Sequence, residues 1–411
     1  MLAAAWLASL VMLQPALQEY EAELADGTQV SGSLVALKAD RTVTLAHDRA
    51  VDVPGSALVR LRQRGVPLPA WPSGPHLLLT NGDRLPGRFV RLDNRFAIVR
   101  PAWTNDPTEE LRVPLSVLSV VWLDLAAHSL DPHSLEWGEG KRPRDVFFFR
   151  NGDRHQGTLI DYDPKTHSLR AKDPDTGRVA AYELTRLGAL ALSTELSRKP
   201  RVTDPYWQLV LAGGGRLSVT ELRSDGKEFV GKTLFGSTVK LPLHAVIELA
   251  VRGGPAVYLS ELKPSAYEYT PYQPAAGLSW PLSINRSVSG RPLMLQTARG
   301  REVFDRGLGT HSQCRVSYRL DGQYRRFAAL VGLHDEAQAG QRGSVQIDIL
   351  CDGQSRLAEP LRELTHADGP RAVDIDVTKV KQLTLIVNFG RGADVQDHVD
   401  WVDARLIRLP Q

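Results

Sequence analysis

The chain has 411 residues, 42% of them hydrophobic and 24% charged, which is ordinary for a soluble globular protein of roughly two to four domains. Its formal net charge is only +3, because 50 lysines and arginines nearly balance 47 acidic residues. A nucleic-acid-binding protein is expected to carry a clustered basic face, so this balance gives no support to nucleic acid as a partner.

The N-terminus begins with an uncharged apolar run, MLAAAWLASLVMLQPALQ. The run is too short to span a bilayer comfortably, which takes about 20 residues, and it is typical of the hydrophobic part of a secretory leader. A buried N-terminal helix is the alternative. We therefore expect residues 1–18 to be a signal peptide or leader. The protein would then be exported to the periplasm, cell envelope or exterior, with no membrane span in the mature chain.

Four segments share one pattern of an apolar strand, a tight turn and a second strand. They read ELADGTQVSGSLVAL from Glu23, LLTNGDRLPGRFVRL from Leu78, FFRNGDRHQGTLIDY from Phe148 and LVLAGGGRLSVTELR from Leu209. The Asp-Gly and Asn-Gly pairs of the first three copies predict two-residue hairpins with type I′ turns. A second glycine follows in these copies and predicts a bent or bulged strand. The fourth copy has Val219 at that place, which predicts a distorted unit.

Each copy continues with a strand, one short helical turn and a final strand, as in LRVPLSVLSVVWL from Leu111. This order of motifs resembles the Sm-like and SH3-like small β-barrels, and the resemblance implies a fold only, because the RNA-contacting phrases of the Sm family are absent. We predict four such barrels, at residues 19–66, 74–127, 144–196 and 204–252. Linkers rich in proline and glycine predict separate beads that act as spacers. Docking of a protein partner on exposed barrel edges is the alternative.

Residues 255–411 show short alternating strands with turn signals between them, for example from Cys314 to Leu320, and no sustained helical periodicity. This pattern predicts a jelly-roll β-sandwich, and the whole chain is therefore expected to be all-β. Cys314 and Cys351 both lie in predicted strands. They would form one disulfide in an exported protein, or remain two buried free thiols.

A set of ordered phrases runs through this C-terminal segment from about Val257 to Arg408: YLSEL, RGLGTHS, YRLDGQYRRFAALVGLHDE, GSVQIDILCDG and DHVDWVDARL. Together they resemble the NPCBM family of carbohydrate-binding modules, which were first noted beside glycosidase catalytic domains. The resemblance implies a galactose-binding-like jelly roll that binds a sugar at one end and can hold a structural calcium ion.

Three candidate sugar-binding residues lie in the loops that open this segment. Tyr272 and Trp280 stand in proline-rich stretches, where an exposed ring could stack on a pyranose or pack across the end of the sandwich. Arg286 could bridge sugar hydroxyls or pair with an acid.

The remaining candidates carry polar groups at predicted strand ends. His311 could bond a sugar hydroxyl or pin its own loop through the backbone, and Asp335 and Glu336 could accept sugar hydroxyls, ligate calcium or simply be solvated turn acids. Asp397 and Asp400 precede the last strand. They could ligate calcium, which takes six to eight oxygen ligands, or close the end of the sandwich by hydrogen bonds.

In the last predicted strand, successive side chains are expected to point to opposite faces. This alternation places Val402, Ala404 and Leu406 on one face and Asp403 and its alternate neighbours on the other, with Trp401 nevertheless expected in the core.

Catalysis is not expected, because the nucleophile-elbow, zinc-protease, Walker and dinucleotide-binding motifs are all absent. The sequence thus predicts a secreted or envelope-associated, non-catalytic carbohydrate-binding protein whose partner is a glycan. The alternative is a structural or protein-interaction component of a bacterial cell envelope with no sugar ligand.

Overall fold

The computed structural model describes residues 18–93, 95–123, 140–200, 202, 205–273, 279–335, 342–358 and 362–409. Residues 1–17 of the predicted leader lie outside these ranges. Within them the regular elements are β-strands and single turns of 3₁₀-helix, so the described chain is all-β as predicted. No helix in this part of the chain is long and apolar enough to cross a membrane.

The N-terminal part consists of four five-stranded antiparallel units, named repeats 1 to 4. Repeat 1 comprises β1 (Glu19–Leu24), β2 (Gln29–Leu37), β3 (Val43–Ala46), β4 (Ala50–Val53) and β5 (Leu58–Gln63). Repeat 2 comprises β6 (His76–Leu79), β7 (Arg84–Asp93), β8 (Phe96–Pro101), β9 (Leu111–Pro114), η1 (Leu115–Val117) and β10 (Leu118–Trp122). Repeat 3 comprises β11 (Asp145–Phe149), β12 (Arg154–Asp163), β13 (Ser168–Lys172), β14 (Val179–Glu183), η3 (Leu184–Arg186) and β15 (Leu187–Ala191). Repeat 4 comprises β16 (Tyr206–Leu211), β17 (Arg216–Ser224), β18 (Glu228–Thr233), β19 (Thr238–Pro242), η4 (Leu243–Ala245) and β20 (Val246–Arg252).

All four repeats share one pairing scheme. The first strand pairs with both the second and the fifth, and the second, third and fourth follow in order. In repeats 2 to 4 the predicted helical turn stands between the fourth and fifth strands as a 3₁₀ turn. The assignment of these units to the SH3-like or Sm-like barrels stays a prediction.

The turn between the first two strands differs from the predicted two-residue hairpin. In repeat 1 it comprises four residues, Ala25 to Thr28, and only Gly27 has a positive φ, of 92°. Asp26 instead keeps an ordinary φ and accepts a hydrogen bond from the Thr28 backbone N–H at 2.9 Å. The prediction was wrong because the side-chain acceptor makes an Asx turn, leaving the left-handed position to the glycine alone.

The second glycine of repeats 1 to 3 has the predicted role of letting one strand bend closely across another. A Cβ on Gly32 would lie 2.8 Å from the carbonyl oxygen of Ala46 on β3. Repeat 4 has Val219 in place of this glycine, and its second strand is irregular there: the register of β17 with β18 shifts between Thr220 and Arg223, and Glu221 has a φ of 53°. Gly231 of β18 packs against Val219, whose Cγ1 would be 2.5 Å from a Cβ at that position.

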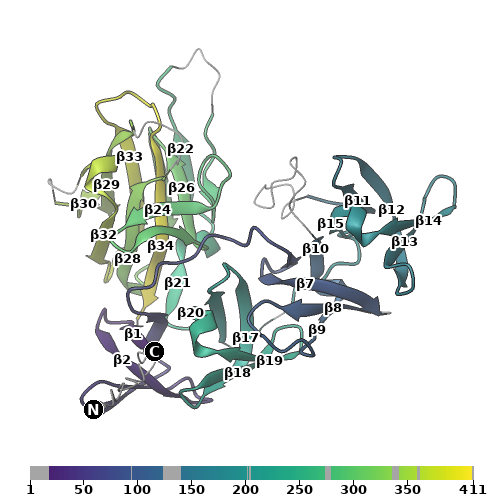
Figure 1. Ribbon diagram of the computed structural model, residues 1–411. Coiled ribbons are helices and arrows are strands. Elements are labelled where there is room, and N and C mark those ends of the chain that lie inside the picture. The colour runs from purple at the N-terminus through teal and green to yellow at the C-terminus, as the bar shows by residue number, and fades with distance from the viewer. Residues whose placement is uncertain are drawn as a thin grey trace, which may run out of the picture.

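The repeats are paired rather than strung as separate beads, which corrects the expectation from the linkers. The closing strands β5 and β20 join repeats 1 and 4, with Leu61 opposite Leu249. The closing strands β10 and β15 join repeats 2 and 3, with Val121 opposite Leu190. Their buried side chains belong to one continuous apolar cluster. In Figure 1 repeats 1 and 4 lie beneath the C-terminal domain, and repeats 2 and 3 form an arm to one side.

The C-terminal domain is a sandwich of two antiparallel sheets. One contains β23 (Ser283–Ile284), β26 (Gly307–His311), β34 (His398–Arg408), β28 (Tyr324–Leu333) and β32 (Arg371–Asp376), with β21 (Ala256–Tyr258) beside β34. The other contains β22 (Ala266–Tyr269), β27 (Cys314–Arg319), β33 (Gln382–Phe389), β29 (Ser344–Cys351) and β30 (Gln354–Ser355), with β31 (Glu363–Thr365) beside β29. A hairpin of β24 (Leu293–Thr297) and β25 (Gly300–Phe304) and the turns η5 (Leu259–Glu261) and η8 (His366–Asp368) complete the domain. Apolar side chains from both sheets form its core.

Both cysteines are buried and free, which confirms the second of the two alternatives. Cys314 on β27 lies opposite Val387 of the central strand β33, whereas Cys351 on β29 lies opposite Leu383. The two thiols therefore flank β33 at different heights and are too far apart to form a disulfide.

The last strand, β34, breaks the expected alternation. Asp403 has a φ of 50°, and the register with β28 shifts at this point, as in a β-bulge. Trp401 and Ala404 consequently both enter the sandwich core, whereas Val402 packs toward the repeats with Leu68 and Ile247. The prediction of one regular face was wrong for this reason, and the core position of Trp401 is confirmed.

Buried ion pairs join the sandwich to the repeats. Arg60 of β5 contacts Glu23 and Asp403, each at 2.8 Å, and Arg405 of β34 also pairs with Glu23. Two further pairs, Arg62–Glu302 and Arg84–Asp305, connect repeats 1 and 2 with the end of β25 and the turn after it. Because charges inside a protein must be paired to be tolerated, this network fixes one orientation of the sandwich on the repeats.

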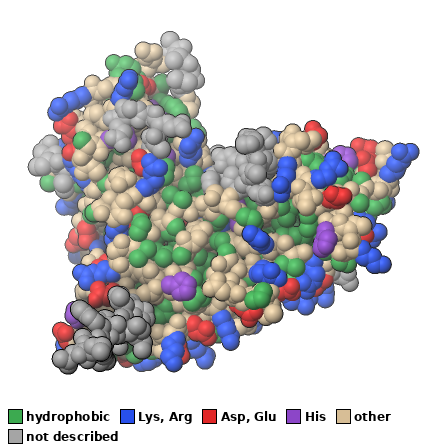
Figure 2. Space-filling view, viewed as in Figure 1, with side chains coloured by type: hydrophobic (Ala, Val, Ile, Leu, Met, Phe, Trp, Pro, Cys, Tyr) green, Lys and Arg blue, Asp and Glu red, His purple; other side chains and the backbone are tan. Residues whose placement is uncertain are grey.

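Charged side chains of both signs are interspersed over the face shown in Figure 2, and this face carries no single basic surface.

Candidate functional site

Several of the predicted site residues lie at the end of the sandwich where β26 ends and β34 begins. This end of β34 points away from the repeats in Figure 1, and we call it the distal end. Three strands of one sheet meet there, since His311 at the end of β26 lies opposite His398 at the start of β34, and Leu333 at the end of β28 lies opposite Val399. The last residue of β22, Tyr269, lies opposite Cys314 at the start of β27. Strand ends from both sheets therefore bring these loops together.

Glycines let a loop pack closely against β26. A Cβ on Gly309 would lie 2.3 Å from the carbonyl oxygen of Arg286 and 2.7 Å from the backbone of Ser287. Only glycine fits this contact, which explains the glycines of the RGLGTHS phrase as packing residues.

Four rings form a cluster at the distal end, which we call the ring cluster: Tyr269, Trp280, His311 and His398. The indole of Trp280 stacks on His311 with centroids 4.7 Å apart and an interplanar angle of 4°. His398 lies 5.4 Å from Trp280 and 5.3 Å from His311, and Tyr269 meets His311 edge-on at 6.3 Å. The Trp280 backbone is also held, because its carbonyl accepts a hydrogen bond from the Tyr267 hydroxyl at 2.6 Å.

The other predicted loop aromatic, Tyr272, stands beside this cluster. Half of its surface is exposed, and the edge of its ring meets Phe389 at the end of β33, with centroids 5.2 Å apart. Trp280 is half-buried. Both loop rings are thus supported from one side by framework rings while retaining accessible surface.

His311 is nearly fully buried, and its Nδ1 lies 2.7 Å from the carbonyl oxygen of Ser312. Burial lowers the pKa of His311 below its usual range, so the ring is neutral at pH 7 and donates through Nδ1. This geometry matches the predicted loop-pinning role. A contact with a sugar stays a prediction.

Asp397 ties three segments together. Its carboxylate accepts hydrogen bonds from the Ser312 hydroxyl at 2.5 Å and from the Ser344 backbone N–H at 3.1 Å. Burial raises the pKa of Asp397 to about 6, and the nearby charge of Asp394 acts in the same direction. The side chain links β26, β29 and β34.

Asp400 is also fully buried, and it anchors the β24–β25 hairpin. Its Oδ2 accepts a hydrogen bond from the Met294 backbone N–H at 3.0 Å and lies 2.6 Å from Nδ1 of His334. Asp397 and Asp400 thus serve different partners. No group of three or more potential metal ligands occurs among the described residues. Asp397 and Asp400 alone supply fewer oxygen ligands than calcium takes, and the calcium ion stays a prediction.

Two other predicted residues have partners within the protein. Asp335 is buried and pairs with Arg301 of β25 at 2.5 Å. Arg286 turns away from the ring cluster, donating to the carbonyl oxygen of Gly290 at 2.8 Å and lying 5.0 Å from the ring of Trp71 in the linker between repeats 1 and 2. Glu336 lies outside the described residues.

The structure adds three residues that were not among the sequence candidates: Tyr269, His334 and His398. His398 stands inside the DHVDW phrase, and Tyr269 ends the alternating stretch AYEY. Both signals were visible in the sequence. Their meeting was not, because it depends on the pairing of β26 with β34 and of β22 with β27.

The chain is similar to a solved module of family CBM51 from a Clostridium perfringens GH95 enzyme in complex with methyl-galactose, with 25% identity over 37% of this chain and 99% of that one and a TM-score of 0.33. It is also similar to the tandem CBM51 modules of the family 98 glycoside hydrolase from Streptococcus pneumoniae SP3-BS71, with 11% identity over 82% of this chain and 88% of that one and a TM-score of 0.33.

None of the curated proteins compared with the chain matches it. A family model matches residues 256–407, which are the residues of the sandwich from β21 to β34. The C-terminal sandwich is an NPCBM/NEW2 domain.

Proposed function

We propose that the C-terminal sandwich binds a glycan at its distal end and that the chain is a secreted or envelope-associated, non-catalytic carbohydrate-binding protein. The observation that carries the proposal is the pair of loop rings, Tyr272 and Trp280. Both retain accessible surface, and both are braced by rings of the sandwich framework. A rigid ring with an accessible face suits the apolar face of a pyranose, because little side-chain entropy is lost when the sugar stacks on it.

Polar groups beside the rings would set the orientation of the sugar. His398 is half-buried next to Trp280, and Asp394 lies close enough to raise the pKa of Tyr269 together with burial. An imidazole can donate a hydrogen bond to a sugar hydroxyl or accept one from it, and a carboxylate can accept one. A few such polar groups beside an apolar surface are typical of sites for small ligands.

Binding without catalysis is proposed because the buried carboxylates of the distal end have structural partners. Asp397 and Asp400 each accept hydrogen bonds from protein donors. A glycosidase instead needs two carboxyl groups that face each other across the sugar. In this proposal the four repeats are a support that holds the sandwich with its distal end outward.

A glycan array probed with the full chain tests the proposal. The array should include methyl-galactose and N-acetylglucosamine as defined probes, together with larger glycans. We expect a restricted set of hits, and Trp280→Ala should weaken each of them by about tenfold, since an aromatic contact contributes about 0.5–1.5 kcal/mol beyond the area that it buries.

Trp103→Ala is the matched control, because Trp103 is also a half-buried tryptophan but belongs to repeat 2. It should leave the hits unchanged. An array without hits, from a chain whose far-ultraviolet circular dichroism shows folded β-structure, would favour a structural envelope component instead.

A further inference from the structure

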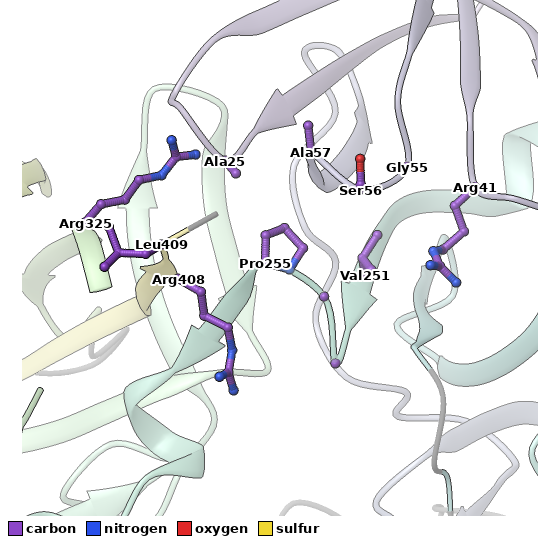
Figure 3. Close-up of a pocket in the computed structure, with 12 residues that line it drawn as sticks. Ala25, Arg41, Gly55, Ser56, Ala57, Val251, Pro255, Arg325, Arg408 and Leu409 are labelled. Atoms are coloured by element: carbon purple, nitrogen blue, oxygen red, sulfur yellow. The ribbon is translucent and has the colours of Figure 1, made fainter. Parts of the chain in front are cut away.

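A cleft of about 650 Å³ lies where repeat 1, repeat 4 and the sandwich meet, at the opposite end of the sandwich from the ring cluster (Figure 3). Repeat 1 contributes Arg41 and the turn of residues 55–57, and the segment after β20 contributes residues 253–255. The sandwich contributes Arg325 of β28 and Arg408 of β34. Figure 3 shows Arg325 and Arg408 on one side of the cleft and Arg41 on the other.

The charges that line this cleft have one sign. Its 12 lining residues, all within the described chain, include these three arginines and no aspartate or glutamate. No ion pair and no side-chain hydrogen bond to a described residue is found for Arg41, Arg325 or Arg408. The Nε atoms of Arg41 and Arg325 are buried from solvent and have no hydrogen-bond acceptor among the described residues.

Arginines elsewhere at the same junction are paired. Arg60 lies 2.8 Å from Glu23 and from Asp403, and Arg84 lies 2.5 Å from Asp305. The chain as a whole has almost as many acids as bases. Among the described residues Arg41, Arg325 and Arg408 form no ion pair, and an acid that acts on one of them is the exposed Asp26, whose pKa is lowered mainly by hydrogen bonds from Thr28 and also by Arg325. Buried donors without acceptors are destabilising, and this arrangement is relieved when an anion enters.

The chemistry of the lining defines the class of ligand. Guanidinium groups match phosphate, sulfate and carboxylate groups in shape and charge, with two parallel hydrogen bonds per group. The exposed hydroxyl of Ser56 adds a neutral donor or acceptor. The volume lies within the range of small-molecule sites, roughly 300–1,000 Å³, so it accepts more than a bare ion.

We propose that this cleft is a binding site for a small anionic molecule, with a phosphate, sulfate or carboxylate group held by Arg41, Arg325 and Arg408. Because the site is contributed by repeat 1, the segment after repeat 4 and the sandwich, a bound anion would also strengthen their mutual arrangement. The proposal does not depend on glycan binding at the distal end.

Isothermal titration calorimetry of the full chain in a low-salt, phosphate-free buffer tests the site. The probes are inorganic phosphate, glucose 6-phosphate, glucuronate and, as a neutral probe, glucose. We expect at least one charged probe to bind and glucose not to bind at this site. If phosphate alone binds most tightly, the preferred ligand is a free inorganic anion. If glucose 6-phosphate binds most tightly, the ligand is a phosphorylated organic molecule, and if glucuronate does, it is a carboxylate.

The decisive variant replaces all three arginines, as Arg41→Gln, Arg325→Gln and Arg408→Gln together. Its affinity for the charged probes should fall by about tenfold or more. The matched control, Arg186→Gln, Arg223→Gln and Arg315→Gln together, removes the same charge from exposed arginines outside the cleft and should bind like the wild type.

If circular dichroism shows that the triple variant is misfolded, the single variants Arg41→Gln and Arg408→Gln replace it. Each single variant should weaken the binding of the charged probes. Trp280→Ala should not change anion binding, which separates this site from the proposed glycan site. The proposal is overturned if no charged probe binds the wild type, or if the cleft variants bind as tightly as the control.

Discussion

The two ends of the sandwich are built with different chemistry. The distal end gathers rings from β22, β26, β34 and the segment between β22 and β23, and its buried carboxylates accept hydrogen bonds mostly from neutral donors. The opposite end contacts the repeats through buried arginine–carboxylate pairs and through a small apolar cluster of Ala25, Val59, Ala256 and Ile407.

This difference separates an end that is attached to the repeats from an end with accessible rings. Ion pairs buried at a junction impose one geometry, because a displaced partner would leave a charge buried without a counter-ion. The rings of the distal end are supported by other rings of the sandwich and keep accessible surface, which a ligand could cover. The sandwich is thus fixed at one end, whereas its other end keeps accessible ring surface, which is the surface that the proposed glycan site uses.

The largest expected effect is at the junction. Glu23 contacts three arginines, Arg60, Arg405 and Arg326, and although burial alone favours its protonated form, Arg60 and Arg405 hold the pKa of Glu23 at about 2. Glu23→Gln should lower the free energy of unfolding by about 3–5 kcal/mol, because it leaves these guanidinium groups buried together. Chemical denaturation followed by circular dichroism measures the change.

Glu19→Gln is the control for this variant. Glu19 pairs with Arg64 at 3.0 Å, but both side chains are about half exposed, so removal should change stability by less than about 1 kcal/mol. If the two variants lower the free energy of unfolding equally, the ion pairs of the junction contribute no more to stability than an ion pair on the surface.

The distal end should respond to pH through Asp397. Its pKa is raised by burial from 3.8 to about 6, so the folded state binds a proton more tightly than the unfolded state does. The associated stabilisation is complete below about pH 4 and is lost as the pH rises through about 6, a change of about 2–3 kcal/mol. Asp397→Asn removes this titration. The wild type should therefore gain stability relative to the variant between pH 7 and pH 4.

Denaturation curves of both proteins at pH 4, 5, 6 and 7 measure this difference. A difference that stays constant with pH, or that changes in the opposite direction, would show that Asp397 is not a buried carboxyl of the distal end.

The smallest expected effect is on thiol reactivity. Cys314 stands at the distal end and Cys351 at the opposite end, and both are 1% exposed. Burial raises the pKa of both thiols, that of Cys314 to about 12. Neither should react with Ellman's reagent at pH 8 in the native protein, and both should react after denaturation. Rapid native labelling of Cys314 alone would indicate that the distal end opens readily.

Much of the architecture was predictable because it depends on local patterns. Repeated turn phrases predicted four related units, and alternation predicted the strands of the sandwich. Pairing of the repeats was not predictable, because hydrogen bonds between β5 and β20 join residues almost 190 positions apart. The bulge at Asp403 was hidden for a different reason, since a non-glycine residue with positive φ gives no clear signal in the sequence.

The candidate site was predictable as a set of phrases but not as contacts. Trp280 and His311 were both expected near a ligand, yet only the fold places one ring on the other. Arg286 was expected there as well and instead stacks over Trp71, because its loop packs beneath Gly309 and faces the repeats. The arginine-lined cleft was invisible in the sequence, since its three arginines come from segments far apart in the chain.

The central claim is that the distal end binds a glycan while the opposite end does not. Calorimetric titration of the best array hit into the wild type, the Tyr272→Ala and Trp280→Ala double variant, and the Arg41→Gln, Arg325→Gln and Arg408→Gln triple variant tests it directly. The account predicts that the double variant loses at least about tenfold in affinity and that the triple variant binds this glycan like the wild type. Unchanged affinity of the double variant, or a loss confined to the triple variant, would contradict it.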